Sequence, residues 1–429
     1  MNDNYSKLVE RLNDNDRNIR LESLQKLMDM VNAGEIQRPV NGGHVNNHIH
    51  TTYSFSPYSP TKALWMAYNA GLTTAGIVDH DSISGAEEFI RAGQIIGMAT
   101  TIGAECRVDF SKTPMAGKKL NNPDQKTIAY VTIHGIPHNR IEDVKKFFQP
   151  YLLERNKRNV GMVEKLNGLV AGAGAKLDFE KDVRPLSRNN EGGSVTERHL
   201  LYALALKLIE KFGKGPGLLD YLKNGLGLKV STKIESMLLD LENPYYEYDL
   251  LGLLKGELVE AFYIDAAAEC PDVKDYIALA RSIGAISAYA YLGDIGDSVT
   301  GDKKSQKFED DYIEELFELL RQLGFNGVTY MPSRNTMEQL KRVKGLCDRH
   351  GFFQISGEDI NSPRQSFICK AMENKEFDNL IDSTWALIGH EKAATENNEN
   401  GMYTAGTMAK YPALQDRIDV FKEIGRERQ

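Results

Sequence analysis

Along the chain, short apolar runs alternate with longer segments in which apolar residues recur at helical spacing. About seven short runs have the apolar and β-branched composition of strands. In chain order, these runs are HVNNHIH, TTAGIVDH, MATTIGAE, TIAYVTIHG, GAISAYAY, FNGVTYM and FFQISGED. Segments with helical spacing, such as PTKALWMAYNAG and DYIEELFELLRQLG, lie between several of them. Strand, helix, glycine and strand in succession are typical of βα units on a parallel sheet, and about seven such runs favour a closed barrel over an open sheet, so we predict an α/β barrel.

One long interval between the fourth and fifth runs lacks a strand pattern. From about Asn139 to Leu258 the chain is rich in charges, and its apolar residues recur at helical intervals. Ser194 and Glu197 have the spacing of a capping box at the start of one such helix. The pattern indicates a helical insertion between two barrel strands.

Helical patterns also precede and follow the barrel. We therefore predict an N-terminal helical extension (1–38), a discontinuous barrel (39–139 and 256–370), a helical insertion that caps the barrel (140–255) and a C-terminal helical tail (371–429). No internal repeat or low-complexity tract interrupts this organisation.

Composition narrows the class of protein. Of 429 residues, 41% are hydrophobic and 26% are charged, which is typical of a soluble globular chain. The net charge of −8 argues against broad binding to nucleic acid or to an anionic membrane. The four cysteines lie far apart without a CxxC motif, and we find neither a signal peptide nor an apolar run of the roughly 18 residues that a membrane helix needs. We expect a cytoplasmic protein.

Histidines and carboxylates gather at the ends of the predicted strands. His48 and His50 alternate at the end of the first run, so both imidazoles face the same space. The other members of the set each end or follow a later run: His80, Glu105, His134 and Asp359. The carboxyl ends of strands in a parallel barrel open onto one face, where active sites lie. A structural role explains any single one of these residues equally well, but the whole set predicts a shared site.

These residue types indicate a metal site. Imidazole and carboxylate suit Zn²⁺, Mn²⁺ or Fe²⁺, and a carboxylate can bridge two ions. Metal-dependent amidohydrolases are one candidate class, because their barrels also open with HxH on the first strand. Their bridging ligand is usually a lysine or a carboxylated lysine, whereas Glu105 ends a strand here.

Several motifs resemble those of one family of metal-dependent hydrolases. The segments HIHTTYSFSP, VDHDSISGAEEF, GAE and ISGEDIN, together with the strand-ending His134, are similar to the successive motifs of PHP-domain (polymerase and histidinol phosphatase) phosphoesterases. The resemblance spans most of residues 44–139 and 255–369. It implies a distorted (β/α)7 barrel and the metal-dependent hydrolysis of phosphate esters.

The resemblance also implies roles for individual residues. The family's metal ligands correspond to His48, His50, His80, Glu105, His134 and Asp359, with Glu105 as the bridge. The insertion is similar to that of members that act on nucleotides or short RNA, whose phosphate-facing segments correspond to Arg155, Arg158, Arg198 and His199. On this hypothesis a metal-activated water at Glu105 attacks the ester, and Asp359 and His80 handle protons.

Three places depart from the family's pattern. Phe55 and Ser56 stand where the first motif usually offers another ligand, while Tyr291 and Asn361 each replace a histidine. The remaining ligands complete one site, so we predict one well-held metal ion and at most a weaker second one. His390, in the predicted tail, could supply a missing ligand, although we favour a structural role for it.

The leading hypothesis is a cytoplasmic hydrolase of a small phosphomonoester or nucleotide, with Zn²⁺, Mn²⁺ or Fe²⁺ as cofactor and without stable nucleic-acid binding. A hypothesis from a different class is a degenerate barrel that binds a phosphorylated ligand without turnover. Phe55, Tyr291 and Asn361 are the features that favour this alternative.

Overall fold

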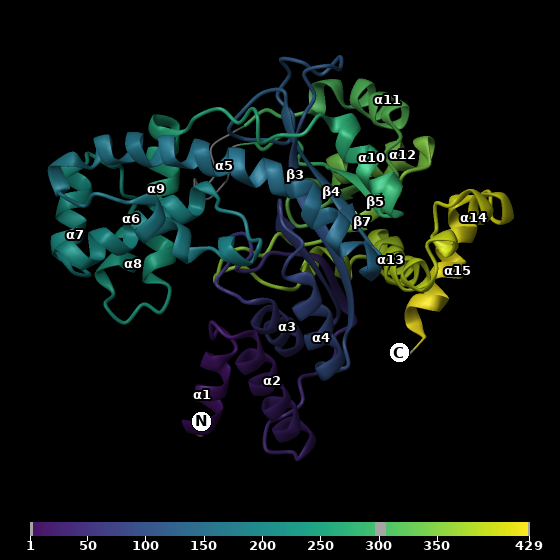
Figure 1. Ribbon diagram of the computed structural model, residues 1–429, viewed down its shortest axis with the longest axis horizontal. Helices are drawn as coiled ribbons and strands as arrows, with labels where there is room; N and C mark the ends of the chain where they lie inside the picture. The colour runs from purple at the N-terminus through teal and green to yellow at the C-terminus, as the bar shows by residue number, and fades with distance from the viewer. Residues whose placement is uncertain (1–2, 297–305, 428–429) are drawn as a thin grey trace.

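The computed structural model of the protein describes residues 3–296 and 306–427, and a seven-stranded sheet lies at its centre (Figure 1). The strands follow one another across the sheet in chain order. Their bounds are β1 (His44–Ile49), β2 (Leu72–His80), β3 (Ala99–Asp109), β4 (Ile128–His134), β5 (Ile286–Ala290), β6 (Gly327–Tyr330) and β7 (Phe353–Ser356). Each predicted run overlaps one of these strands, although β2 begins one residue before its run and β3 extends to Asp109, beyond the end of its run, and the α/β fold class is confirmed.

The sheet curls so that the segment after β7 reaches back to β1. The backbone amide of His50 donates to the carbonyl of Ile360 at 3.0 Å, and the amide of Ile360 donates to the carbonyl of His48 at 3.1 Å. Gly357 lies so close to β1 that a Cβ added to it would come within 2.6 Å of the His48 Cβ. Only glycine allows the two backbones to approach in this way.

One strand runs against the predicted direction. β4 is antiparallel to both β3 and β5, whereas the other neighbouring strands pair in parallel. The prediction of an all-parallel sheet was wrong here, because residues 110–127 contain no helix and connect β3 to β4 as a hairpin does. His134 therefore lies opposite Gly103 and not at the rim where the parallel strands end.

Helices on the outside of the sheet form the main hydrophobic core with it. They are α3 (Pro60–Asn69), α4 (Ala86–Ile96), α10 (Val273–Ile283), α11 (Ile313–Leu323) and α12 (Met337–His350). Each presents an apolar stripe to the strands, as the fully buried Phe89 and Phe317 illustrate. This packing fixes the strand order that brings the strand ends together.

Two helices precede the barrel, as predicted. α1 (Asp3–Arg11) leads into α2 (Arg17–Asn32), which packs against α3 and α4. The buried guanidinium of Arg20 forms an ion pair with Glu88, whose carboxylate also accepts a hydrogen bond from the Thr61 hydroxyl at 2.6 Å. A buried, hydrogen-bonded pair thus anchors the extension, of which residues 1 and 2 lie outside the described part.

The insertion is a helical block with its own hydrophobic core, on the left in Figure 1. Its helices are α5 (Ile141–Leu169), α6 (Glu197–Phe212), α7 (Pro216–Asp220), α8 (Thr232–Leu239) and α9 (Tyr246–Phe262). The capping box of α6 consists of Thr196 and His199, not of the predicted Ser194 and Glu197, because Thr196 is the residue that caps the helix. Phe55, from the loop after β1, joins this core.

Three helices form the C-terminal tail: α13 (Asp378–Glu396), α14 (Ala405–Lys410) and α15 (Leu414–Arg426). α13 and α15 pack so closely that a Cβ added to Gly389 would collide with the carbonyl of Phe421. Residues 428 and 429 of the predicted tail lie outside the described part. Among the described helices, none is long and apolar enough to cross a membrane.

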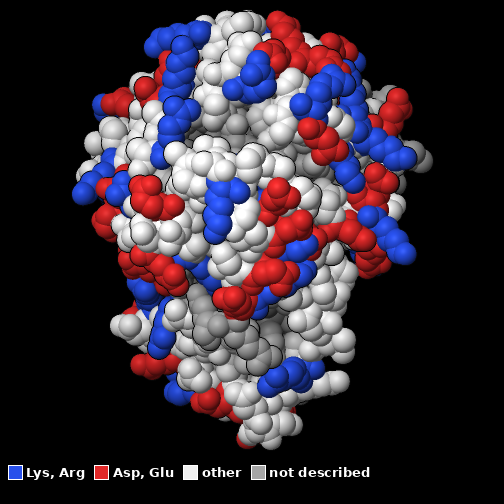
Figure 2. Space-filling model, turned by 90° about the vertical axis from the view of Figure 1, so that its right-hand side faces the viewer, with Lys and Arg blue, Asp and Glu red and all other residues white. Residues whose placement is uncertain are grey.

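Charges are mixed on the face from which Figure 2 views the molecule, the side of α14 and α15. Lys and Arg side chains are interspersed there with Asp and Glu. Apart from a column of blue side chains at the upper left, positive and negative side chains alternate over this face.

Candidate metal centre

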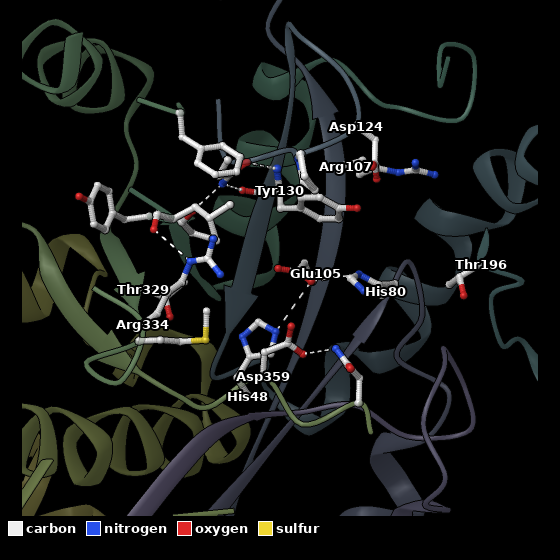
Figure 3. Close-up of a pocket in the computed structure, with 18 of the residues that line it drawn as sticks. His48, His80, Glu105, Arg107, Asp124, Tyr130, Thr196, Thr329, Arg334 and Asp359 are labelled. Carbon is white, nitrogen blue, oxygen red and sulfur yellow. Dashed lines mark hydrogen bonds and ion pairs between the residues drawn. The ribbon is translucent and has the colours of Figure 1, made fainter. Parts of the chain in front are cut away.

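Four side chains from different strands or strand ends, those of His48, His80, Glu105 and Asp359, line one cavity (Figure 3), and His50 contacts two of them. His48 lies in β1 and His50 just after it, His80 ends β2, Glu105 lies in β3, and Asp359 follows β7. The Nε2 atoms of His48 and His50 are 3.2 Å apart, and His50 Nε2 lies 3.1 Å from Asp359 Oδ1. Glu105 Oε2 lies 3.0 Å from His80 Nδ1 and 3.8 Å from His48 Nε2. Five of the six predicted ligands are thus brought together.

The donor atoms form two overlapping groups that fit a divalent cation. His48, His50 and Asp359 offer one atom each within 4.8 Å of one another, and so do His50, His80 and Glu105. Imidazole nitrogens combined with carboxylate oxygens are ligands that Zn²⁺, Mn²⁺ and Fe²⁺ accept. His50 belongs to both groups and is therefore the central residue of the candidate site.

The charges of these groups favour metal binding. Burial alone would raise the pKa of Glu105, but His48 and His80 hold that pKa well below its usual value. Burial also opposes ionisation of Asp359, yet its contact with His50 and the nearby His48 and Arg198 keep its pKa far below the ordinary range. Burial and the neighbouring His80 lower the pKa of His50. At neutral pH the carboxylates are ionised and the His50 imidazole is neutral, the states in which both bind metals.

A buried carboxylate orients the loop that carries His50. Asp79 accepts hydrogen bonds from the Thr51 amide at 2.7 Å, the Thr51 hydroxyl at 2.6 Å and the Ser54 hydroxyl at 2.7 Å. The same Ser54 hydroxyl lies 3.4 Å from Nδ1 of His50. Such partners fix the tautomer and orientation of a ligating imidazole. The sequence analysis missed Asp79, although it directly precedes His80 on β2.

His134 lies apart from both groups of donor atoms. It pairs with Gly103 on β3, so its side chain faces the same side of the sheet as Glu105. The residue is 1% exposed, and within the described part of the chain its Nε2 has no hydrogen-bond partner. Burial lowers the pKa of His134 to about 3 and keeps the ring neutral. Its role as a ligand of a second ion stays a prediction.

The cavity beside these residues has a volume of 480 Å³ and lies between the barrel and the helical block. Its lining includes the cationic side chains of Arg107, Arg155, Arg198, Lys255 and Arg334. In Figure 3, Arg334 lies on one side of the metal ligands, and Arg107 and Thr196 lie on the other. A ligand in the cavity would therefore meet the candidate metal ligands and positive charge together.

Two of the predicted phosphate-binding arginines are held by carboxylates. Arg155 lines the cavity, but its guanidinium forms a buried ion pair with Asp81. Arg158 does not line the cavity, and it contacts both Glu197 and Glu269 at 2.5 Å. The charges of both arginines are therefore neutralised within the protein. Arg158 has a structural role, because it connects α5 to Glu197 and Glu269.

The other two predicted residues lie side by side in sequence but differ in surroundings. Arg198 lines the cavity and donates to the side-chain oxygen of Asn361 at 2.8 Å. His199 is buried at the start of α6, where its Nδ1 accepts from the Thr196 amide at 3.0 Å. Burial lowers the pKa of His199 to about 3. The structure thus brings Arg198 to the cavity and places His199 in the capping box of α6, opposite Thr196.

The positions that depart from the family's pattern have other partners. The Asn361 side-chain amide donates to Asp359 Oδ1 at 2.7 Å, and the Tyr291 hydroxyl donates to Asp310 at 2.6 Å. Phe55 packs edge-on against His199, with ring centroids 5.0 Å apart. His390 accepts from the Met402 amide within the tail. Asn361 therefore supports a ligand, and His390 has the structural role that the sequence favoured.

Three cationic residues of the cavity were not predicted. Arg107 is buried in β3 and contacts Glu197 at 3.2 Å and Glu269 at 3.0 Å. It stands two residues after Glu105 and so faces the same way, which is a signal that the sequence offered. Lys255 in α9 and Arg334 after β6 carry no comparable signal, because neither belongs to a motif.

Comparisons with known proteins support the fold. No family model matches the chain, and no curated protein matches it. A crystal structure of a candidate metal-dependent phosphoesterase from Bifidobacterium adolescentis is similar, with a TM-score of 0.50 and 17% identity over 78% of this chain and 94% of that one. A structure described as an amidohydrolase from Chromobacterium violaceum, with bound sulfate and no metal, has a TM-score of 0.48 and 15% identity over 76% of this chain and 89% of its own. The first likeness shows a shared fold.

Proposed function

We propose that this protein is a metal-dependent phosphoesterase that hydrolyses a small phosphomonoester or a nucleotide. The observation that carries the proposal is the clustering of His48, His50, His80, Glu105 and Asp359, of which all but His50 line a cavity that also holds cationic side chains. The motif resemblance and the shared fold with a candidate phosphoesterase point the same way. An amidohydrolase would usually have a lysine as bridge, whereas Glu105 contacts two of the histidines here.

Each member of the site has a proposed task. His48, His50 and Asp359 would hold one ion, and Glu105 would be a further ligand, together with His80 or His134 if a second ion binds. A bound divalent cation lowers the pKa of water and polarises the phosphoryl oxygens. His50 stays neutral, and Asn361 holds the Asp359 carboxylate in place by its amide.

His80 is the proposed proton-transfer residue of the chain. Its side chain is 26% exposed, while its Nδ1 contacts Glu105. Asp359 was predicted to share this task. The very low pKa of Asp359 makes it a weak base, so we propose that it acts mainly as a metal ligand.

The test is hydrolysis of p-nitrophenyl phosphate and a panel of nucleotides by protein that has been stripped of metal and then supplied with Mn²⁺ or Zn²⁺. We expect phosphate release only with added metal, and little release by the Asp359→Asn variant. Glu164→Gln, on the exposed face of α5, is the matched control and should behave as the original protein does. Undiminished turnover in chelator, or by Asp359→Asn, would contradict the proposal.

A second candidate function is ligand binding without turnover. It is favoured by the partners of Tyr291 and Asn361, since neither side chain takes the place of a histidine ligand in the structure. This alternative predicts a rise in Tm with phosphorylated ligands but no product with any metal. Metal-dependent product formation would eliminate it.

A further inference from the structure

Lys255 is a partly buried cation of α9 that lines the cavity. Within the described part of the chain, no residue forms a hydrogen bond or an ion pair with its ammonium group. Arg198 of α6 lies nearby, and its recorded contact is the single hydrogen bond to Asn361. Two cationic groups from the helical block thus face the same space without carboxylate partners.

The other arginines on this side of the cavity are neutralised. Arg107 contacts Glu197 and Glu269, and Arg155 forms an ion pair with Asp81. Three carboxylates face Lys255 at longer range, namely Asp124, Glu197 and Asp359. Glu197 is already engaged by arginines and Asp359 by His50. The positive charge of Arg198 and Lys255 is therefore left for a ligand.

The proximity of these two cations is unfavourable until an anion joins them. Repulsion by Arg198, followed by burial, lowers the pKa of Lys255 to about 8. Asn361 connects the pair to the metal ligands, since it accepts from Arg198 at 2.8 Å and donates to Asp359 at 2.7 Å. A group held by the two cations would lie close to the candidate ion.

We infer that Arg198 and Lys255 form an anion-binding pair that holds the non-bridging oxygens of a phosphomonoester. This inference rests on the proposed function for the ester and adds Lys255 as a residue that determines specificity. Arg198 would offer its planar fork and Lys255 a point charge. Two cations beside a metal ion match the double charge of a monoester better than the single charge of a diester.

The first experiment measures phosphate binding without relying on turnover. The Mn²⁺-loaded protein and the variants Lys255→Met and Lys255→Arg are titrated with inorganic phosphate by calorimetry. We expect Lys255→Met to weaken binding roughly 10- to 100-fold and Lys255→Arg to restore most of it. Lys233→Met, at an exposed lysine of α8, is the matched control and should bind as the original protein does. Equal Tm values of the variants verify folding.

The second experiment uses selectivity and pH. Lys255→Met should raise KM for p-nitrophenyl phosphate more than for bis-p-nitrophenyl phosphate. The diester carries one negative charge fewer, so it loses less attraction when the lysine is removed. Lysine is charged below its pKa, so phosphate affinity of the original protein should fall as pH rises through about 8. Lys255→Arg should retain its affinity further into alkaline pH, since guanidinium stays charged.

The outcomes separate this inference from the proposed function. Hydrolysis with unchanged phosphate affinity and KM in Lys255→Met would overturn the anion pair and leave the phosphoesterase standing. Phosphate binding that depends on Lys255, without hydrolysis of any ester, would support the pair and overturn the phosphoesterase. If the original protein shows neither binding nor hydrolysis, both are wrong.

Discussion

The rim of the barrel and the helical block form opposite walls of one cavity, and they contribute different chemistry to it. The rim supplies imidazoles and carboxylates that contact one another at distances such as 3.0 Å between His80 and Glu105. The block supplies Arg198 and Lys255, which belong to helices with a separate hydrophobic core. The candidate metal ligands thus depend on strand geometry, whereas the proposed anion-binding side depends on how two cores pack.

The largest expected effect comes from breaking the rim. Glu105→Gln removes the charge that contacts His48 and His80, and it should lower kcat by about 1,000-fold while the metal content falls. Steady-state assays and elemental analysis measure the two effects. The affinity of Glu105→Gln for phosphate should fall less than its activity, because Arg198 and Lys255 of the helical block are unchanged. Full activity of Glu105→Gln would show that the rim of the barrel does not supply an essential metal ligand through Glu105.

The next largest effect is expected on the ion pairs that hold the helical block against the barrel. Glu269 is 3% exposed and contacts Arg107 of β3 and Arg158 of α5, so Glu269→Ala would leave two buried guanidinium groups short of a partner. The free energy of unfolding should fall by about 3 kcal/mol. Urea denaturation measures it, with the exposed Glu164→Ala as control. A change below about 0.5 kcal/mol would show that these charges do not hold the two regions together.

A smaller effect sharpens the description of the rim. Asp79→Asn keeps the size of the side chain but removes the charge that accepts hydrogen bonds from Thr51 and Ser54. Metal affinity should fall by roughly 10- to 100-fold, because the loop that carries His50 loses its orientation. Metal titration in a competing chelator tests this. If the metal affinity of Asp79→Asn is unaltered, Asp79 does not contribute to the site and only the direct ligands determine metal binding.

The smallest effect lies outside both walls. His138 contacts Glu391 of α13 at 2.9 Å, and although burial opposes protonation, this carboxylate raises the pKa of His138. The pair therefore stabilises the fold fully below the unfolded pKa of about 6.5, and the contribution disappears as pH rises through the higher folded value. His138→Gln should cost on the order of 1 kcal/mol at pH 5.5 and less at pH 8.5, by urea denaturation. An equal loss at both pH values would contradict this assignment.

The sequence pattern predicted most of the fold because it reflects local physics. Short apolar runs identified the seven strands and helical periods identified the insertion, since burial shapes the pattern of each element separately. The direction of β4 was missed because residues 110–127 were not recognised as a hairpin connection. Direction depends on the path of the chain between strands and leaves no period in the strand itself.

The candidate site was predictable to the extent that its residues stand at strand ends. His48, His50, His80, Glu105 and Asp359 meet because parallel strands end together. The arginines were harder to assign, since Arg158 is neutralised by residues 39 and 111 positions later along the chain, Glu197 and Glu269. Which cation remains for a ligand depends on such long-range pairs. Lys255, which has no ion-pair partner among the described residues, could not be singled out from sequence.

The contact between β1 and Ile360 would give a bound cation a further role in holding the barrel closed. Ile360 bonds to the backbone of both His48 and His50, and Asp359 is its neighbour in the chain. An ion held by the side chains of His48, His50 and Asp359 would connect β1 to the segment after β7, where the barrel closes. Because it would bind only the closed form, it would tighten that form by mass action. Removing it should loosen this connection first, and the Ile360 amide should then exchange its proton with solvent sooner than amides deep in the sheet.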